Sequence, residues 1–126
     1  MAKKALLAVA CGVLLATGLW AAEPQATAVV CTGVENRQPQ GVGEEFPGQV
    51  GALFCFSEVK NYEGTLLHVW FHGEKEVARI ELPVKGERFR TWSKKRIPAS
   101  WTGPWRVEVQ TADGKVLAQA KFTVKD

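Results

Sequence analysis

"TLLHVWFHGEKEVARIELPV", residues 65–84, holds two runs of alternating side chains joined by the turn residues GEK. A period of two is typical of β-strands that bury one face. The first run separates an apolar face from a face that carries both histidines of the chain: Leu67, Val69 and Phe71 against His68, Trp70 and His72. We therefore expect a β-hairpin with the first of these faces in the core and the second outside.

The same rhythm of short apolar stretches and turn residues continues along the chain, at intervals of about ten residues. We predict strands over 26–34, 49–59, 65–72, 76–84, 88–93, 104–110 and 116–124, with long loops at 35–48 and 94–103. The sequence ADGK before the last strand is a strong hairpin signal. The pattern predicts an all-β chain, folded as an immunoglobulin-like antiparallel β-sandwich of about seven strands.

The first 22 residues have a different composition. MAKK is basic, an uncharged apolar run covers residues 5–20, and two alanines precede the first acidic residue, Glu23. This is the pattern of a secretory signal peptide, and the run is shorter than the roughly 20 residues of a membrane-spanning helix. We predict a periplasmic or secreted protein. An uncleaved inner-membrane anchor is an alternative, because Leu19 and Trp20 occupy cleavage-site positions where small residues are preferred, but the short apolar run makes it the less favoured one.

Cleavage of residues 1–22 would leave residues 23–126 as a single domain. Lys3 and Lys4 would leave with the signal, which lowers the net charge from +3 to +1. A nearly neutral domain has no overall field that attracts nucleic acid. We expect no nucleic-acid partner, and contact with a membrane only if the signal segment is retained.

Two cysteines, Cys31 and Cys55, remain in the domain. In an oxidising compartment an even number of cysteines permits a disulfide bond between them. The alternative is a pair of small buried side chains with free thiols. Neither cysteine has a second cysteine nearby, so the spacing of a zinc site is absent from the sequence.

Catalytic motifs are also absent from the sequence. His68 and His72 lie four residues apart on one predicted strand, a separation of about 13 Å that excludes a shared metal ion. The chain contains neither G-x-S-x-G nor H-E-x-x-H. We predict a protein that is not an enzyme and that uses no metal or cofactor.

Residues 85–96 concentrate positive charge around a tryptophan, with six basic residues against one acid, Glu87. We assign the candidate binding site to an outer face of the sandwich formed by His68, Trp70, Arg88, Arg90 and Trp92, with Lys94, Lys95 and Arg96 at its rim. An indole can stack on a sugar ring while guanidinium groups hold an anion. The alternative is a structural ladder in which arginine stems cover the indoles, and composition favours this ladder.

Several motifs occur in a characteristic order: the H-x-W of His68 and Trp70, then FRTWS at 89–93 with Lys95, then the G-x-W of Gly103 and Trp105. With VENRQP at 34–39, they resemble the bacterial domain-of-unknown-function family 2914 over residues 26–125. The chain has Phe89 where a tryptophan is common in the family. The resemblance implies a small exported or envelope β domain, and it implies no activity.

Together these observations predict a non-catalytic exported envelope domain that acts as an interaction or accessory module for an envelope protein or polysaccharide. The alternative is a carbohydrate-binding domain that uses Trp92 and Trp70 as a stacking platform.

Overall fold

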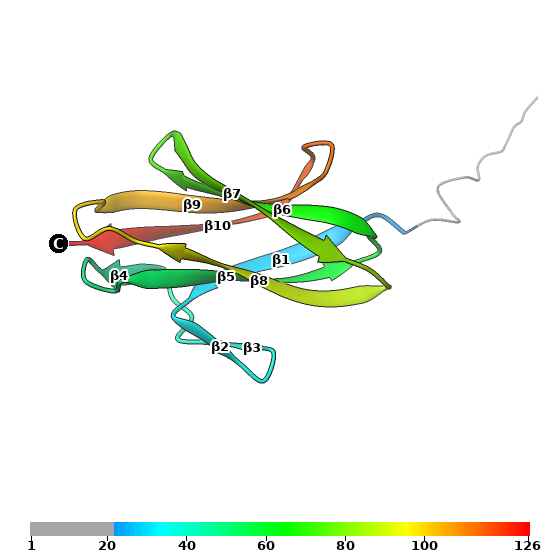
Figure 1. Ribbon diagram of the computed structural model, residues 1–126, viewed down its shortest axis with the longest axis horizontal. Helices are drawn as coiled ribbons and strands as arrows, with labels where there is room; N and C mark the ends of the chain where they lie inside the picture. The colour runs from blue at the N-terminus through cyan, green and yellow to red at the C-terminus, as the bar shows by residue number, and fades with distance from the viewer. Residues whose placement is uncertain (1–21) are drawn as a thin grey trace, which may run out of the picture.

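The computed structural model describes residues 22–126, which form ten strands and, over this range, no helix (Figure 1). The strands are β1 (Gln25–Cys31), β2 (Gly33–Glu35), β3 (Gln38–Gln40), β4 (Glu45–Pro47), β5 (Ala52–Lys60), β6 (Gly64–His72), β7 (Lys75–Val84), β8 (Arg88–Arg96), β9 (Gly103–Thr111) and β10 (Val116–Lys125). The described residues therefore include no helix that could cross a membrane. The predicted signal peptide lies, except for its last residue, outside the described part of the chain.

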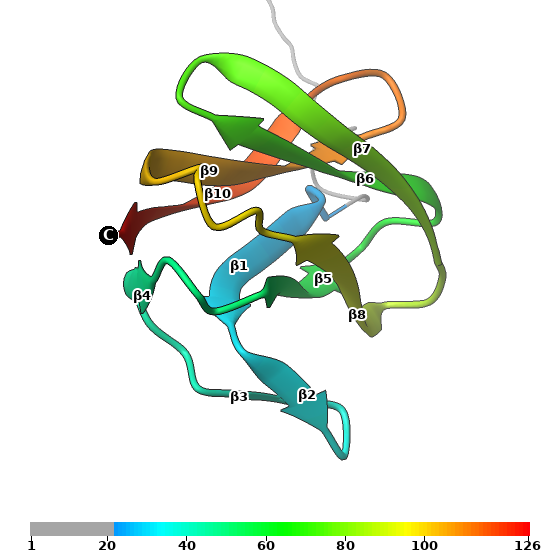
Figure 2. The same cartoon turned by 60° about the vertical axis from the view of Figure 1, so that its left-hand side comes forward.

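Two sheets face each other, and a separate hairpin of β2 and β3 projects from them (Figures 1 and 2). The smaller sheet has the order β1-β5-β8 and the larger the order β4-β10-β9-β6-β7. All neighbours are antiparallel except β4 and β10, which run parallel. The order places β1, β5 and β8 as strands A, B and E of an immunoglobulin sandwich, and β10, β9, β6 and β7 as G, F, C and C′. The predicted all-β antiparallel sandwich is confirmed.

Each of the seven predicted strands coincides with one of the seven long strands, within a few residues at the ends. The three short strands β2, β3 and β4 were not predicted, because they lie in or next to a segment rich in proline and glycine. Two residues in the turn between β2 and β3, Asn36 and Arg37, have φ values of 53° and 59°. Positive φ at both central positions is the geometry of a tight two-residue hairpin, which usually uses glycine.

The core lies between the two sheets and is centred on Trp70 of β6, whose side chain is fully buried. Its ring packs edge-on against Phe122 of β10, with centroids 6.2 Å apart. Cys55 of β5 belongs to the same cluster. A buried tryptophan on the strand equivalent to C is a hallmark of immunoglobulin domains.

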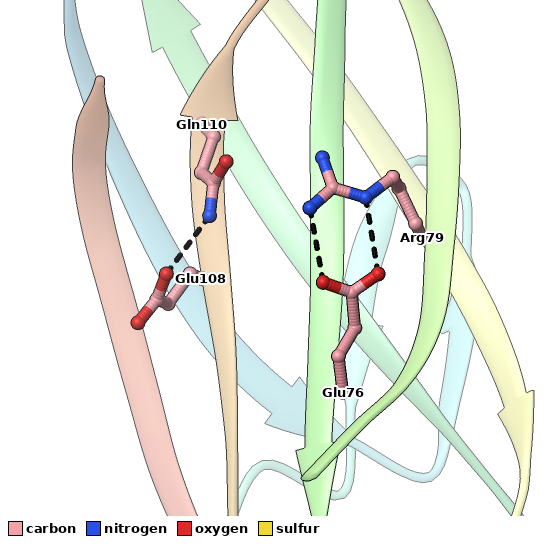
Figure 3. Close-up of polar contacts among 4 residues, drawn as sticks. All are labelled: Glu76, Arg79, Glu108 and Gln110. Atoms are coloured by element: carbon pink, nitrogen blue, oxygen red, sulfur yellow. Dashed lines mark hydrogen bonds and ion pairs between the residues drawn. The ribbon is translucent and has the colours of Figure 1, made fainter. Parts of the chain in front are cut away.

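The predicted faces of β6 were wrong. His68 and Trp70 point into the sandwich, and Val69 lies on the outer face of the larger sheet although its exposure is 0%. Val69 is paired with Arg79 on one side and Glu108 on the other. A polar layer on this face consists of the Arg79–Glu76 ion pair and the Gln110–Glu108 hydrogen bond, each with contacts of 2.9 Å (Figure 3). Both faces of β6 are therefore covered, and alternation alone could not choose between them.

Of the two alternatives for the cysteines, the structure contains the free thiols: Cys31 and Cys55 are both unbridged and buried. On the paired strands β1 and β5, Val30 is the partner of Cys55, and Cys31 is the partner of Phe54. Neighbouring residues of a strand point to opposite faces, so the two Cβ atoms are directed to opposite sides of the sheet. A disulfide bond requires Cβ atoms about 4 Å apart that point toward each other.

Candidate functional site

Alternate residues of β8 project from the outer face of the smaller sheet. Thr91 and Ser93 are buried between the sheets, whereas Arg88, Lys94 and Arg96 are exposed. Because side chains alternate along a strand, the even-numbered residues share the outer face. The basic-aromatic face consists of Arg88, Arg90, Trp92, Lys94 and Arg96 of β8 with Phe54 and Phe56 of β5, which pair with them across the sheet. Five of the eight predicted site residues lie on this face.

The aromatic rings of the basic-aromatic face support one another. Trp92 stacks on Phe56 with a centroid distance of 5.9 Å and an interplanar angle of 8°. The Nζ atom of Lys94 lies 5.8 Å from the centroid of the Phe54 ring. Such stacked and cation–π pairs contribute about 0.5–1.5 kcal/mol each. The predicted ladder of arginine stems over indoles stays a prediction, because the aromatic contacts of this face are the Trp92–Phe56 stack and the Lys94–Phe54 pair.

Two of the four cations on this face have a polar partner. The guanidinium of Arg88 lies 2.9 Å from the carboxylate of Glu58, and Arg90 donates a hydrogen bond of 3.4 Å to the carbonyl of Arg37. The second contact joins β8 to the turn of the β2–β3 hairpin, which lies beside the smaller sheet (Figure 2). Lys94 and Arg96 form no ion pair with the described residues. Their charges remain available to an anionic ligand.

Lys95 was predicted at the rim of the basic-aromatic face, but its side chain points away from this face. Its Nζ atom lies 5.5 Å from the Trp101 ring and donates a hydrogen bond of 2.7 Å to the Arg96 carbonyl. Partial burial, together with the nearby charge of Arg96, lowers the pKa of Lys95. Lys95 therefore caps one end of the sandwich, because an odd-numbered residue of β8 cannot point outward with its neighbours.

His68 was predicted on the outer face, but it lies fully buried between two serines from the opposite sheet. Its Nε2 atom is 2.8 Å from the Oγ atom of Ser57, and its Nδ1 atom is 2.7 Å from the Oγ atom of Ser93. Burial lowers the pKa of His68 to about 4, so the ring is neutral near pH 7. A neutral ring donates one of these hydrogen bonds and accepts the other.

Trp70, the other residue predicted on the outer face, completes the same network. Its Nε1 atom donates a hydrogen bond of 3.2 Å to the Oγ atom of Ser93. We call Ser57, His68, Trp70 and Ser93 the buried polar cluster. Sequence reasoning did not find Ser57 and assigned no hydrogen bond to Ser93, although Ser93 ends the FRTWS motif. A signal that could have found them is the presence of one serine inside each of these two strands.

A serine hydroxyl next to a histidine can act as a nucleophile, but the two hydroxyls of this cluster are enclosed in the core. Ser57 and Ser93 have exposures of 0% and 5%, so a substrate would have to enter the core to reach them. No carboxylate contacts the His68 ring, which instead uses both nitrogens on hydroxyl groups. Every buried polar side-chain atom of the described residues has a hydrogen-bond partner. This geometry serves packing between the sheets.

His72 and two tryptophans close one end of the sandwich. The His72 ring stacks on Trp101 at 5.5 Å with an interplanar angle of 3°, and it lies 4.8 Å from the Trp105 ring. Its Nε2 atom donates to the Thr102 carbonyl at 2.8 Å. Lys95 covers Trp101 from a further direction. Trp101 therefore plugs the end of the core.

Clefts lie elsewhere on the surface. One of about 420 Å³ is lined by residues of the β6–β7 turn and the outer side of the larger sheet, among them Glu74, Arg106 and Lys121. None of the predicted site residues lines it. The described residues contain no group of three or more His, Cys, Asp or Glu side chains that could hold a metal ion.

A comparison with known protein families identifies a match for part of the chain. Residues 63–124, from the start of β6 to the end of β10, match the family described as "Protein of unknown function (DUF2914)". The resemblance inferred from the motifs on β6, β8 and β9 is thereby confirmed. The VENRQP segment at 34–39 lies before the matched residues, so its resemblance stays a prediction. No curated protein matches the chain.

Proposed function

We propose that this chain, whose residues 63–124 belong to the DUF2914 family, is a non-catalytic interaction module of the cell envelope that binds an anionic partner. The basic-aromatic face is its binding surface. Export of the module rests on the signal-like composition of residues 1–22. The partner we favour is an envelope protein.

The observation that carries this proposal is a pair of cations on β8 that have no ion-pair partner among the described residues. Lys94 and Arg96 are exposed on one side of a rigid nine-residue strand. Arg88, although paired with Glu58, keeps 61% of its side chain exposed. An exposed ion pair of this kind contributes little to stability, so the guanidinium can exchange its partner at little cost. Cations held on a rigid strand favour a ligand with regularly spaced negative charges.

The absence of an activity is part of the same proposal. The buried polar cluster brings the serine hydroxyls and the imidazole together inside the core, where all of their contacts are used. Hydrolysis of an envelope substrate that is lost in His68→Gln, while the variant stays folded, would overturn this part.

A carbohydrate-binding role is supported by fewer observations than the protein-binding role. Trp70 is fully buried, and Trp101 is covered by His72 and Lys95. Trp105 is buried at 2% exposure, so Trp92 is the indole left at a surface suited to stacking. One ring that already stacks on Phe56 is a small platform for a sugar chain. This role would be supported if polysaccharide retards the protein on a native gel and Trp92→Ala abolishes the retardation.

Charge reversal tests the proposed function. Envelope proteins that co-purify with the full chain would be compared between the wild type, Lys94→Glu/Arg96→Glu and the matched control Lys75→Glu/Lys121→Glu. Lys75 and Lys121 are also exposed and form no ion pair in the described part, but they lie on the larger sheet. We expect a partner that is lost only with the first variant. Equal recovery of every partner by all three proteins would rule out the basic-aromatic face as the binding surface.

A further inference from the structure

The free edge of β8 offers a second kind of contact beside the basic-aromatic face. In the order β1-β5-β8 this strand is the last, and β5 is its one strand partner among the described residues. An edge strand presents a row of backbone N–H and C=O groups that can pair with another chain. β8 has nine residues and no proline, so it is long and regular enough to be such a template.

The register shows which peptide groups face this edge. Asn61 N–H donates to the Glu87 carbonyl at 3.0 Å before the β5–β8 ladder, and Ile97 N–H donates to the Gly51 carbonyl at 2.9 Å after it. In an antiparallel ladder, hydrogen-bonded pairs recur at every second residue. The odd-numbered residues of β8 therefore bond to β5, and the even-numbered residues direct their N–H and C=O groups to the free edge.

One of these edge groups is occupied. Lys95 donates its Nζ hydrogen bond to the Arg96 carbonyl, which agrees with the outward direction deduced from the register. The peptide groups of four residues then remain on the edge without a backbone partner among residues 22–126: Arg88, Arg90, Trp92 and Lys94. They span seven residues, or about 24 Å of strand.

The same four residues carry side chains of the basic-aromatic face. A strand added to this edge places one of its side chains directly opposite each of them. β8 contains five basic residues and no acidic residue. Carboxylates opposite the arginines and Lys94 would be favourable, whereas β8 of a second copy would set cation against cation. The charges that protect this edge from self-pairing therefore select an acidic strand.

We propose that the free edge of β8 binds an extended acidic segment of a partner protein, which joins the smaller sheet as a further strand through the peptide groups of Arg88, Arg90, Trp92 and Lys94. The bound segment carries carboxylates at alternate positions and an apolar side chain opposite Trp92. This proposal rests on the proposed function for its face, and it adds the backbone of β8 as the main point of attachment.

The first test uses a synthetic probe. It is a nine-residue capped peptide that alternates glutamate with threonine and has phenylalanine in place of the central glutamate. In the proposed pairing, with the peptide antiparallel to β8, the N–H groups of its glutamates face β8 and those of its threonines face away. Methylation of two glutamate N–H groups should weaken binding at least about tenfold, because two backbone hydrogen bonds are lost. Methylation of two threonine N–H groups is the matched control and should leave the affinity unchanged.

A second test changes the protein. Lys94→Pro removes an N–H group that faces the edge and leaves the bonds to β5 intact, and proline is tolerated at such positions of edge strands. Lys94→Ala removes the same charge and keeps the N–H group. We expect Lys94→Pro to bind the unmethylated peptide more weakly than Lys94→Ala. Circular dichroism and thermal unfolding establish that both variants are folded.

Amide hydrogen exchange gives an independent readout if Lys94→Pro unfolds. Bound peptide should slow the exchange of the Arg90, Trp92 and Lys94 amides, while the odd-numbered amides of β8 are protected already. Binding that is equal for both methylated peptides and leaves these three amides unchanged would overturn strand addition and leave the proposed function standing. No binding of the acidic peptide at low ionic strength would overturn both proposals. Edge protection that depends on protein concentration alone would assign the edge to a second copy and overturn the acidic partner.

Discussion

The Nδ1 atom of His68 lies 2.7 Å from the Oγ atom of Ser93, so a histidine of the larger sheet is hydrogen-bonded to a strand of the smaller one. Ser57 holds the opposite ring nitrogen at 2.8 Å, and Trp70 donates to the same Ser93 hydroxyl. Fully paired polar groups in a core restrict how the packed layers can slide, because any shift leaves donors and acceptors unpaired. The buried polar cluster therefore fixes the relative position of the two sheets.

Ser93→Ala should destabilise the fold by about 1–3 kcal/mol, because it leaves His68 Nδ1 and Trp70 Nε1 buried without their partner. Chemical denaturation of the two proteins measures this difference. Ser100→Ala is the matched control, since Ser100 is exposed in the loop after β8 and should behave like the wild type. A Ser93→Ala protein as stable as the control would show that the cluster contributes nothing to stability.

Acid should weaken the fold through His68. Burial lowers its folded-state pKa from 6.5 to about 4, so the unfolded chain binds the proton more readily between these two values. The contribution of this shift is fully present above pH 6.5, decreases as the pH falls below it, and is lost at about pH 4. At about 1.4 kcal/mol per pKa unit it amounts to ~3 kcal/mol.

The measurement is the free energy of unfolding of wild type and His68→Gln at several pH values between 6.5 and 4. The carboxylates titrate equally in both proteins, so the difference between the two curves isolates His68. Parallel curves would contradict the prediction. The NMR signal of the His68 ring offers a direct check, because it should not titrate until the pH is close to 4.

Both thiols should be inert in the folded protein. Burial raises the pKa of Cys31, and it raises the pKa of Cys55 to about 12, which leaves almost no reactive thiolate near pH 8. Mass spectrometry after alkylation should find the two thiols unlabelled in the native protein and both labelled in denaturant. A mass loss of two hydrogens after native oxidation, mapped to Cys31 and Cys55, would show that the strands rearrange to form the bridge.

Trp101→Ala should open the end of the sandwich at which His72 stacks. Removal of a half-buried indole should cost about 2 kcal/mol, less than a fully buried one. The Trp105 indole donates to the Trp101 main-chain carbonyl at 2.9 Å, and this bond survives the substitution. The expected local signature is faster hydrogen exchange of the Trp105 indole N–H, with the Trp92 indole as internal control. Unchanged exchange at Trp105 would show that Trp101 does not seal this end.

Much of the fold could be predicted because alternation on β7, β9 and β10 separates apolar from polar side chains. Arg106 and Glu108 of β9, for example, do lie on the outer face of the larger sheet, joined by a contact of 3.0 Å. The turn before the last strand could also be predicted from the sequence, because ADGK forms the hairpin between β9 and β10. Strands of three residues, such as β4, are too short to show such a pattern reliably in the sequence.

The candidate site was only half predictable. Arg88, Arg90 and Trp92 share a face because β8 alternates regularly. His68 and Trp70 were misplaced because β6 is buried on both sides, and a histidine in the core is recognisable only when its serine partners on β5 and β8 are known. Those partners are 11 and 25 residues away in the sequence, and the fold brings them to hydrogen-bonding distance.

The parallel pairing of β4 with β10 has a mechanical consequence. Glu45, Phe46 and Pro47 pair with Thr123, Val124 and Lys125, and Thr123 N–H donates to the Glu44 carbonyl at 2.9 Å. The described chain starts at one end of the long axis of the sandwich and finishes at the other (Figure 1). A tension that pulls these two ends apart would run along β4 and β10 in opposite senses. The hydrogen bonds between β4 and β10 would then be loaded together in shear instead of breaking one by one. This short pair of strands would therefore resist mechanical unfolding of the domain.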